Sequence, residues 1–192
     1  MVPVPIFVLM GTAGCGKTSV ALQLKAKLNC RYLEGDSLHP AHNVQKMSEG
    51  HPLNDDDRWP WLREIRDHLA IQIKEVKDLP EDDHRRVVVV TCSSLRKAYR
   101  DILRELPENS ASVIFVYLKG SKELLLSRIS NRKGHFMPAI MLQSQLDTLE
   151  EPDPETENVI VQSIEPPPEE EAQHIIQEAV EKGFLHASAK SL

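Results

Sequence analysis

Residues 11–18 read GTAGCGKT, a complete match to the pattern G-x-x-x-x-G-K-[S/T]. The apolar residues 6–10 precede this loop, and the helix-like residues 19–28 follow it. In a strand, loop and helix arranged in that order, the loop N–H groups and the helix N-terminus surround a phosphate. An accidental glycine turn would not need these flanking segments. The sequence therefore predicts a nucleotide-phosphate site.

Two side chains of the loop have distinct expected roles. Lys17 is expected to reach the β- and γ-phosphates of ATP, and the Thr18 hydroxyl is expected to hold Mg²⁺. Cys15 has two interpretations, a small residue that suits a tight loop or a thiol whose oxidation blocks nucleotide binding, and the first is favoured. The residues expected to bind ATP are Gly11, Thr12, Ala13, Gly14, Cys15, Gly16, Lys17 and Thr18.

Short apolar segments alternate with longer amphipathic ones along the whole chain. We expect strands at residues 6–10, 31–33, 87–91, 113–118 and 158–161, and helices at residues 18–28, 41–47, 59–76, 95–105, 122–132, 139–149 and 169–182. Residues 87–90 are all valine, without polar alternation, which is typical of a strand covered on both faces. The pattern predicts an α/β fold with a parallel sheet between helix layers, where ligands bind beyond the carboxyl ends of the strands.

Composition narrows the class of protein. The 192 residues predict one domain, residues 1–192, and 41% hydrophobic with 27% charged residues is ordinary for a globular protein. The net charge of −6, without clustered Lys and Arg, argues against a nucleic-acid partner. No segment approaches the ~18 apolar residues of a membrane span, and the start of the chain lacks signal-peptide features. Three cysteines, an odd and sparse set, suit a reducing compartment, so we expect a cytoplasmic protein without membrane partners.

Asp36 follows the second expected strand, on the phosphate-loop side of the sheet. A carboxylate there can accept a hydrogen bond from a substrate hydroxyl and orient it, or take its proton. The alternative is a helix cap or a turn residue. Function is favoured because Gly35 would leave the backbone free to approach a ligand.

Three consecutive acids, residues 55–57, precede Arg58. They read better as the first turn of a helix beginning at Asn54 or Asp55 than as a metal site. Arg58 can hold a carboxylate or phosphate with two hydrogen bonds, or form a plain salt bridge, and the residue alone favours neither. Trp59 and Trp61 cannot share a helix face, so we expect one in the core and the other at the site.

A basic helix start follows the third expected strand. Ser93 or Ser94 is the expected cap, and Arg96, Lys97 and Arg100 then oppose the helix dipole. An anionic ligand would offset that cost, and a solvated basic face is the alternative.

Arg128 and Arg132 lie four residues apart, on one face of an expected helix. Gly134 can end that helix and act as a hinge. A flap with two arginines can close over ATP and neutralise charge on the transferred phosphoryl group. The alternative is a helix end whose cations suit its dipole.

The chain resembles the gluconokinases, small P-loop kinases related in architecture to shikimate and nucleoside monophosphate kinases. The resemblance runs from residue 6 to about residue 161 and goes far beyond the phosphate loop. Besides the phosphate loop, the segments that carry it are EGDSLHPAHNVQKMSEGHPLNDDDRWPWL at 34–62, CSSLRKAYRDILR at 92–104, FVYLKG at 115–120 and SRISNRKGHFMPAIMLQSQLDTLEEP at 127–152. The first of these and RKGHF at 132–136 are the most specific.

The resemblance implies ATP- and Mg²⁺-dependent phosphorylation of D-gluconate to 6-phospho-D-gluconate, which feeds the pentose phosphate pathway. It also implies a five-stranded parallel sheet, a mobile lid at about residues 122–150 and a homodimer. The expected catalytic residues are Lys17, Asp36, Arg128 and Arg132, and the expected substrate-binding residues are Asp36, His39, Arg58, Lys97, Arg100 and His135. Two rivals stay open, a kinase of another small hydroxy acid and a regulatory module that binds ATP without a small acceptor.

Overall fold

The structure, a computed structural model, describes residues 2–107, 109–131 and 139–191. Its sheet has five strands in the order β2-β3-β1-β4-β5, and every neighbouring pair is parallel. The strands are β1 (Val4–Met10), β2 (Arg31–Glu34), β3 (Val88–Thr91), β4 (Ala111–Lys119) and β5 (Val159–Ser163). The prediction of a five-stranded parallel sheet is confirmed.

The expected helices are also present. They are α1 (Lys17–Leu28), α2 (Ala41–Ser48), α3 (Asp55–Val76), α4 (Lys97–Arg104), α5 (Lys122–Ser130), α6 (Ala139–Thr148) and α7 (Pro168–Glu181). Two short 3-10 helices, Gly35–Leu38 and Ala187–Ser191, were not expected.

Two helix starts differ in how they are capped. Asn54 caps α3 as expected, because its side chain accepts from the Asp57 N–H while the Asp57 carboxylate accepts from the Asn54 N–H. The expected serine cap of α4 is wrong. The N-cap is Arg96, which makes no side-chain capping bond, while Ser94 has a left-handed backbone with φ of 48°.

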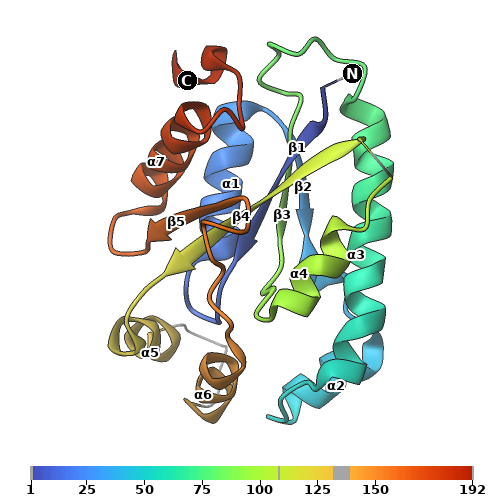
Figure 1. The fold of residues 1–192 in the computed structure, drawn as a ribbon. Coiled ribbons are helices and arrows are strands. Elements are labelled where there is room, and N and C mark those ends of the chain that lie inside the picture. The colour runs from blue at the N-terminus through green and yellow to red at the C-terminus, as the bar shows by residue number, and fades with distance from the viewer. Residues whose placement is uncertain (1, 108, 132–138, 192) are drawn as a thin grey trace.

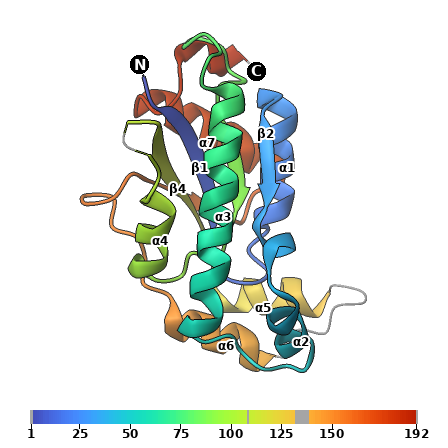
Figure 2. The same ribbon diagram turned by 90° about the vertical axis from the view of Figure 1, so that its right-hand side faces the viewer.

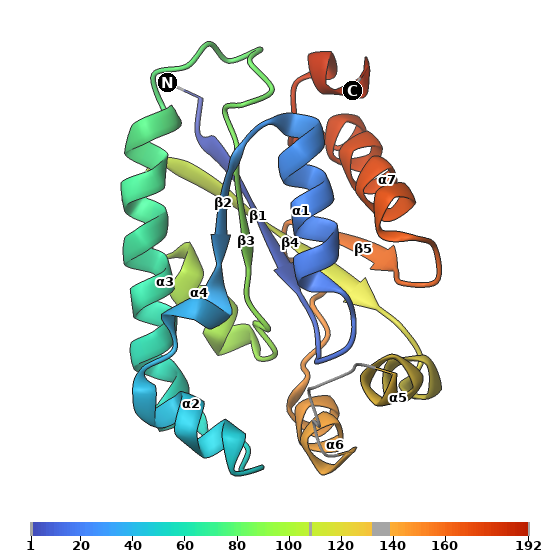
Figure 3. The ribbon, with the colours of Figure 1, turned by 180° about the vertical axis from the view of Figure 1, so that it is seen from behind.

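The helices cover both faces of the sheet (Figure 1). Seen from behind, α1 and α7 lie in front of the sheet, with α3 at its side (Figure 3). Phe7 and Leu9 of β1 belong to the core under α1 and α7, whereas Ile6 and Val8 belong to the core under α3 and α4. Alternate residues of β1 thus enter two cores, which explains why the strand is apolar throughout.

The two ends of the molecule differ. Helices α2, α5 and α6 gather at one end, and both chain termini lie at the other (Figures 1 and 2). The phosphate loop follows β1 at the end where α2, α5 and α6 lie, which is where the carboxyl ends of the strands meet. None of the described helices combines the length and apolarity needed to cross a bilayer.

A buried ion pair ties α4 to the segment before β5. The Arg100 guanidinium donates to both carboxylate oxygens of Glu157, at 2.9 and 2.8 Å, and the two side chains are 1% and 4% exposed. Arg100 also donates to the carbonyl oxygens of Ser94 and Glu150, and Arg104 adds a further bond to Glu157. The pair therefore fixes three segments that are far apart in the sequence.

We expect Glu157→Gln to destabilise the fold, because it leaves the buried Arg100 cation without its counter-charge. Breaking such a pair costs about 3–5 kcal/mol in the free energy of unfolding, measurable by urea titration. The control is Lys97→Met, which breaks the exposed Lys97–Asp101 pair and should cost under about 1 kcal/mol. Equal costs for the two variants would contradict the structural role of Glu157.

The loss of unfolding free energy in Glu157→Gln should also depend on pH. Burial raises the pKa of Glu157, but hydrogen bonds from Arg100 and Arg104 outweigh it and lower that pKa from 4.5 to about 2. Because the pKa is lower in the folded state, the stabilisation is fully present well above pH 4.5 and is lost as the pH falls toward about 2. The difference between wild type and Glu157→Gln should therefore narrow across that range.

Candidate active site

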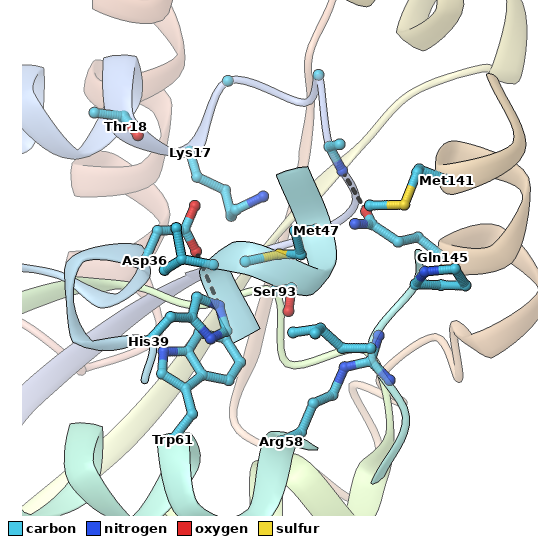
Figure 4. A pocket seen from close by; sticks show the side chains of 16 residues that line it. Lys17, Thr18, Asp36, His39, Met47, Arg58, Trp61, Ser93, Met141 and Gln145 are labelled. Carbon is cyan, nitrogen blue, oxygen red and sulfur yellow. Dashed lines mark hydrogen bonds and ion pairs between the residues drawn. The ribbon is translucent and has the colours of Figure 1, made fainter. Parts of the chain in front are cut away.

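A cleft of about 330 Å³ opens at the carboxyl edge of the sheet. The phosphate loop lines one part of it, and Asp36, His39 and Arg58 line another (Figure 4). These are residues that the sequence predicted for phosphate and substrate. The structure brings them together where open parallel sheets bind ligands.

The phosphate loop is held by close backbone contacts. A Cβ atom on Gly11, whose φ is 138°, would lie 2.9 Å from the Cys15 sulfur and 3.0 Å from the Leu118 carbonyl oxygen. Gly16, with φ of 96°, is the N-cap of α1. The Cys15 side chain is fully buried against Gly11, which favours its interpretation as a small residue that fits the loop.

Lys17 lies across its own loop. Its Nζ donates to the carbonyl oxygens of Gly11 and Thr12, both at 3.0 Å, and lies 3.9 Å from the Cys15 sulfur. The ammonium group therefore lies against the phosphate loop, and the Lys17 side chain lines the cleft.

Glu34 contacts the phosphate loop, and the sequence analysis did not single it out. It ends β2, and its carboxylate accepts a hydrogen bond from the Thr18 hydroxyl at 2.9 Å and others from the hydroxyls of Tyr32 and Thr91. Burial, with a contribution from Glu34, raises the pKa of Tyr32, so this hydroxyl stays a donor. The available signal was an acid at the carboxyl end of a strand beside the phosphate loop.

Asp36 and His39 face each other across a short gap. The Asp36 side chain is 69% exposed, whereas that of His39 is 6% exposed, and His39 Nε2 lies 4.0 Å from an Asp36 carboxylate oxygen. His39 stacks on Trp61 with ring centroids 4.0 Å apart, and the Trp61 N–H donates to the Gly35 carbonyl at 2.8 Å. Trp61 thus belongs to the core and lines the cleft, so the expected division between the two tryptophans is wrong.

Gly35 is needed for a reason other than the expected one. A Cβ atom there would lie 2.0 Å from the Thr91 carbonyl oxygen, so glycine lets the backbone after β2 pack against β3. The Gly35 N–H also donates to the Thr91 hydroxyl at 3.1 Å. These contacts place Asp36, the next residue, at the cleft.

Arg58 is the predicted substrate cation that reaches the cleft. Arg58 lies in the first turn of α3 and is 8% exposed, and its guanidinium lies 5.5 Å from the centre of the Tyr99 ring. Nη1 donates to the Tyr99 hydroxyl at 3.3 Å, and this hydroxyl donates to Asp55. Among the described residues this is the only hydrogen bond of Arg58, and the side chain lines the cleft.

The other predicted cations of the acceptor side, Lys97 and Arg100, do not line the cleft, which corrects their assignment to the substrate. Lys97 pairs with Asp101 on the surface, and Arg100 is buried against Glu157. Arg96 likewise pairs with Asp55 at 2.7 Å. Carboxylates of the chain itself, rather than an anionic ligand, offset the basic start of α4.

Arg128 lies beside the phosphate loop. Its Nη1 donates to the Cys15 carbonyl oxygen at 3.5 Å, and its Nη2 donates to the Ile164 carbonyl oxygen. The other predicted lid residues, Arg132 and His135, and the hinge residue Gly134 fall outside the described residues.

Gln145 of α6 contacts the phosphate loop directly. Its side-chain oxygen accepts a hydrogen bond from the Ala13 N–H at 2.6 Å (Figure 4). Loop N–H groups are the donors that a phosphate would use, so Gln145 occupies one phosphate-binding donor. Nothing in the sequence analysis had singled out this residue.

Residues 55–57 form the first turn of α3, as expected. In the part of the chain that the structure describes, no group of three or more His, Cys, Asp or Glu side chains could hold a metal ion.

Comparison with known proteins agrees with this arrangement. A family described as an AAA domain matches residues 7–140. A probable gluconokinase of Schizosaccharomyces pombe is 44% identical over 83% of this chain and 80% of its own. The thermoresistant gluconokinase of Escherichia coli is 41% identical over 84% and 86%.

A solved structure gives the same picture for the fold. The crystal structure of a gluconokinase from Sinorhizobium meliloti superposes with a TM-score of 0.78, at 38% identity, over 95% of each chain. Sequence and fold therefore agree over most of the molecule, and the chain belongs to the gluconokinase family.

Proposed function

We propose that the protein transfers the γ-phosphoryl group of ATP to D-gluconate and forms 6-phospho-D-gluconate. The observation that carries this proposal is that the phosphate loop and an acid–arginine pair, Asp36 and Arg58, line one cleft. Relatives named gluconokinase, 40–45% identical over most of the chain, support the choice of acceptor.

The loop side of the cleft suits a nucleoside triphosphate. The N-terminus of α1 and the loop N–H groups bind the phosphates, and Lys17 moves from its carbonyl partners to the β- and γ-phosphates. Thr18 and Glu34 offer oxygen atoms of the kind that Mg²⁺ prefers, so they fit the metal that the family implies. When bound, Mg²⁺ would neutralise charge on the phosphates.

The opposite side suits a hydroxy acid. The Arg58 guanidinium can bind the substrate carboxylate with two parallel hydrogen bonds. Asp36 accepts a hydrogen bond from the hydroxyl that is to be phosphorylated and turns its oxygen toward the γ-phosphate. Transfer then depends mainly on alignment and charge neutralisation.

We further propose that residues 122–150 act as a lid over the bound nucleotide. Arg128 already lies against the phosphate loop, and Gln145 contacts it from α6. Closure would exclude water, and Arg128 with Arg132 would stabilise negative charge on the transferred group.

The family resemblance also supports a homodimer. The three buried, unpaired cysteines support a cytoplasmic protein, because they suit a reducing compartment. Light scattering of the purified protein would test the dimer, and localisation of a tagged chain would test the compartment.

The acceptor is tested by measuring ADP release with D-gluconate, other sugar acids, shikimate and nucleoside monophosphates. We expect the highest kcat/KM with D-gluconate, because the cleft offers one cation for a carboxylate and one acid for a hydroxyl. Turnover only with another acceptor would contradict the assignment. Nucleotide binding without turnover of any acceptor would favour a regulatory module.

We expect Lys17→Ala to lower kcat on the order of a hundredfold or more, because the γ-phosphoryl group loses a cation in the transition state. Steady-state kinetics with saturating ATP and gluconate would measure the loss. Lys25→Ala, which removes an exposed lysine of the same helix, is the control and should leave kcat unchanged. Near-normal turnover of Lys17→Ala would refute the assigned role.

A further inference from the structure

His39 has one stacking partner and two polar neighbours at the cleft. It packs on Trp61, and each ring nitrogen faces one polar neighbour. Nδ1 lies 3.2 Å from the side-chain nitrogen of Asn43. Nε2 lies 4.0 Å from an Asp36 carboxylate oxygen, as Figure 4 shows. Which nitrogen carries the proton decides whether His39 offers the cleft a donor or an acceptor.

A backbone carbonyl determines the orientation of the Asn43 amide. Asn43 is fully buried, and its Nδ2 donates to the Asp57 carbonyl oxygen at 2.9 Å. A carbonyl oxygen can only accept, so the amide nitrogen, and not the amide oxygen, must face Asp57. The contact to His39 Nδ1 comes from this same nitrogen atom, which has a second hydrogen.

The Asp57 carbonyl is itself fixed in place. Asp57 forms the capping box with Asn54 at the start of α3, with bonds of 2.9 and 2.8 Å. Its carboxylate also accepts from Lys46 of α2 at 2.5 Å. The orientation of Asn43 is therefore held by the junction of α2 and α3, outside the cleft.

Charge and burial favour the neutral ring. Burial lowers the pKa of His39 below its ordinary 6.5; the Asp36 carboxylate opposes this shift, and the Arg58 guanidinium adds to it. Asp36 belongs to the 3-10 helix before α2, Arg58 to α3, and Lys17 lines the cleft opposite. A proton on Nδ1 would also set two donors against each other, because Asn43 already donates there.

We propose that Asn43 is a positioning residue, which holds His39 as the neutral tautomer protonated on Nε2. His39 then presents a donor to the cleft, beside the acceptor Asp36. The 4.0 Å gap is too long for a direct hydrogen bond, but a single oxygen atom can contact both groups. That oxygen is a substrate hydroxyl, which accepts from His39 and donates to Asp36. Assigning this oxygen to the substrate rests on the proposed function, whereas assigning the His39 tautomer does not.

NMR of the ¹⁵N-histidine-labelled protein tests the tautomer without any assay of activity. His39→Gln assigns the signal, because it removes one of the eight histidines. We expect a pyrrole-type Nε2 and a pyridine-type Nδ1 at neutral pH. A ring protonated on Nδ1, or on both nitrogens, would overturn the proposal. Should the protein not phosphorylate gluconate, this result would still stand or fall by itself.

Variants test what the tautomer does. In Asn43→Leu, the His39 signal should change to a mixture of tautomers, and the KM for gluconate should rise about tenfold while the KM for ATP is unchanged. Asn43→Ser repeats the test should the leucine variant not fold. An unchanged gluconate KM with a changed tautomer would overturn the positioning role.

A comparison of two His39 variants distinguishes the role of the N–H donor from the packing role of the ring. His39→Gln keeps an N–H near the position of Nε2, so it should raise the gluconate KM less than His39→Leu does. His42→Gln, on the exposed side of α2, is the control and should behave as wild type. Equal effects of His39→Gln and His39→Leu would contradict a role as hydrogen-bond donor.

Discussion

Strand β1 is hydrogen-bonded to a parallel strand on each side, to β3 and to β4, and the whole site depends on this pairing. Because the strands run in one direction, their carboxyl ends meet at a single edge of the sheet. The phosphate loop leaves β1 there, Glu34 ends β2 with Asp36 close behind it, and Ser93 follows β3. If one of these strands ran in the opposite direction, the residues that follow it would lie at the other edge of the sheet. The nucleotide side and the acceptor side of the cleft would then not adjoin.

Charged groups divide between holding this edge and facing the cleft. Arg100 and Arg96 are neutralised by acids of the chain, which fixes the loops around α4. Glu34 collects three hydroxyl donors and so ties the phosphate loop to β2 and β3. Lys17 and Arg58 are different, because they line the cleft and their partners there are carbonyls or a hydroxyl. Those two cations are available to phosphate and to a carboxylate.

Most of the fold could be predicted from local patterns in the sequence. The valine run of β3, the apolar β1 and the Asn54 cap of α3 depend on near neighbours in the sequence, so each could be predicted. Long-range partners could not. Arg100 meets Glu157, 57 residues away, and Gln145 meets Ala13 across the cleft. A basic helix start looks the same in the sequence whether its counter-charge is a ligand or a distant acid, which is why Arg100 was assigned to the substrate.

The central claim is that one cleft joins a nucleotide side to an acceptor side, with Arg58 as the cation for the acceptor. The most direct test is the steady-state kinetics of Arg58→Met, with Lys97→Met as the matched control. The KM for gluconate should rise in Arg58→Met by about tenfold or more, the KM for ATP should stay the same, and Lys97→Met should resemble wild type. An unchanged gluconate KM in Arg58→Met, or a selective loss of ATP affinity, would contradict the account.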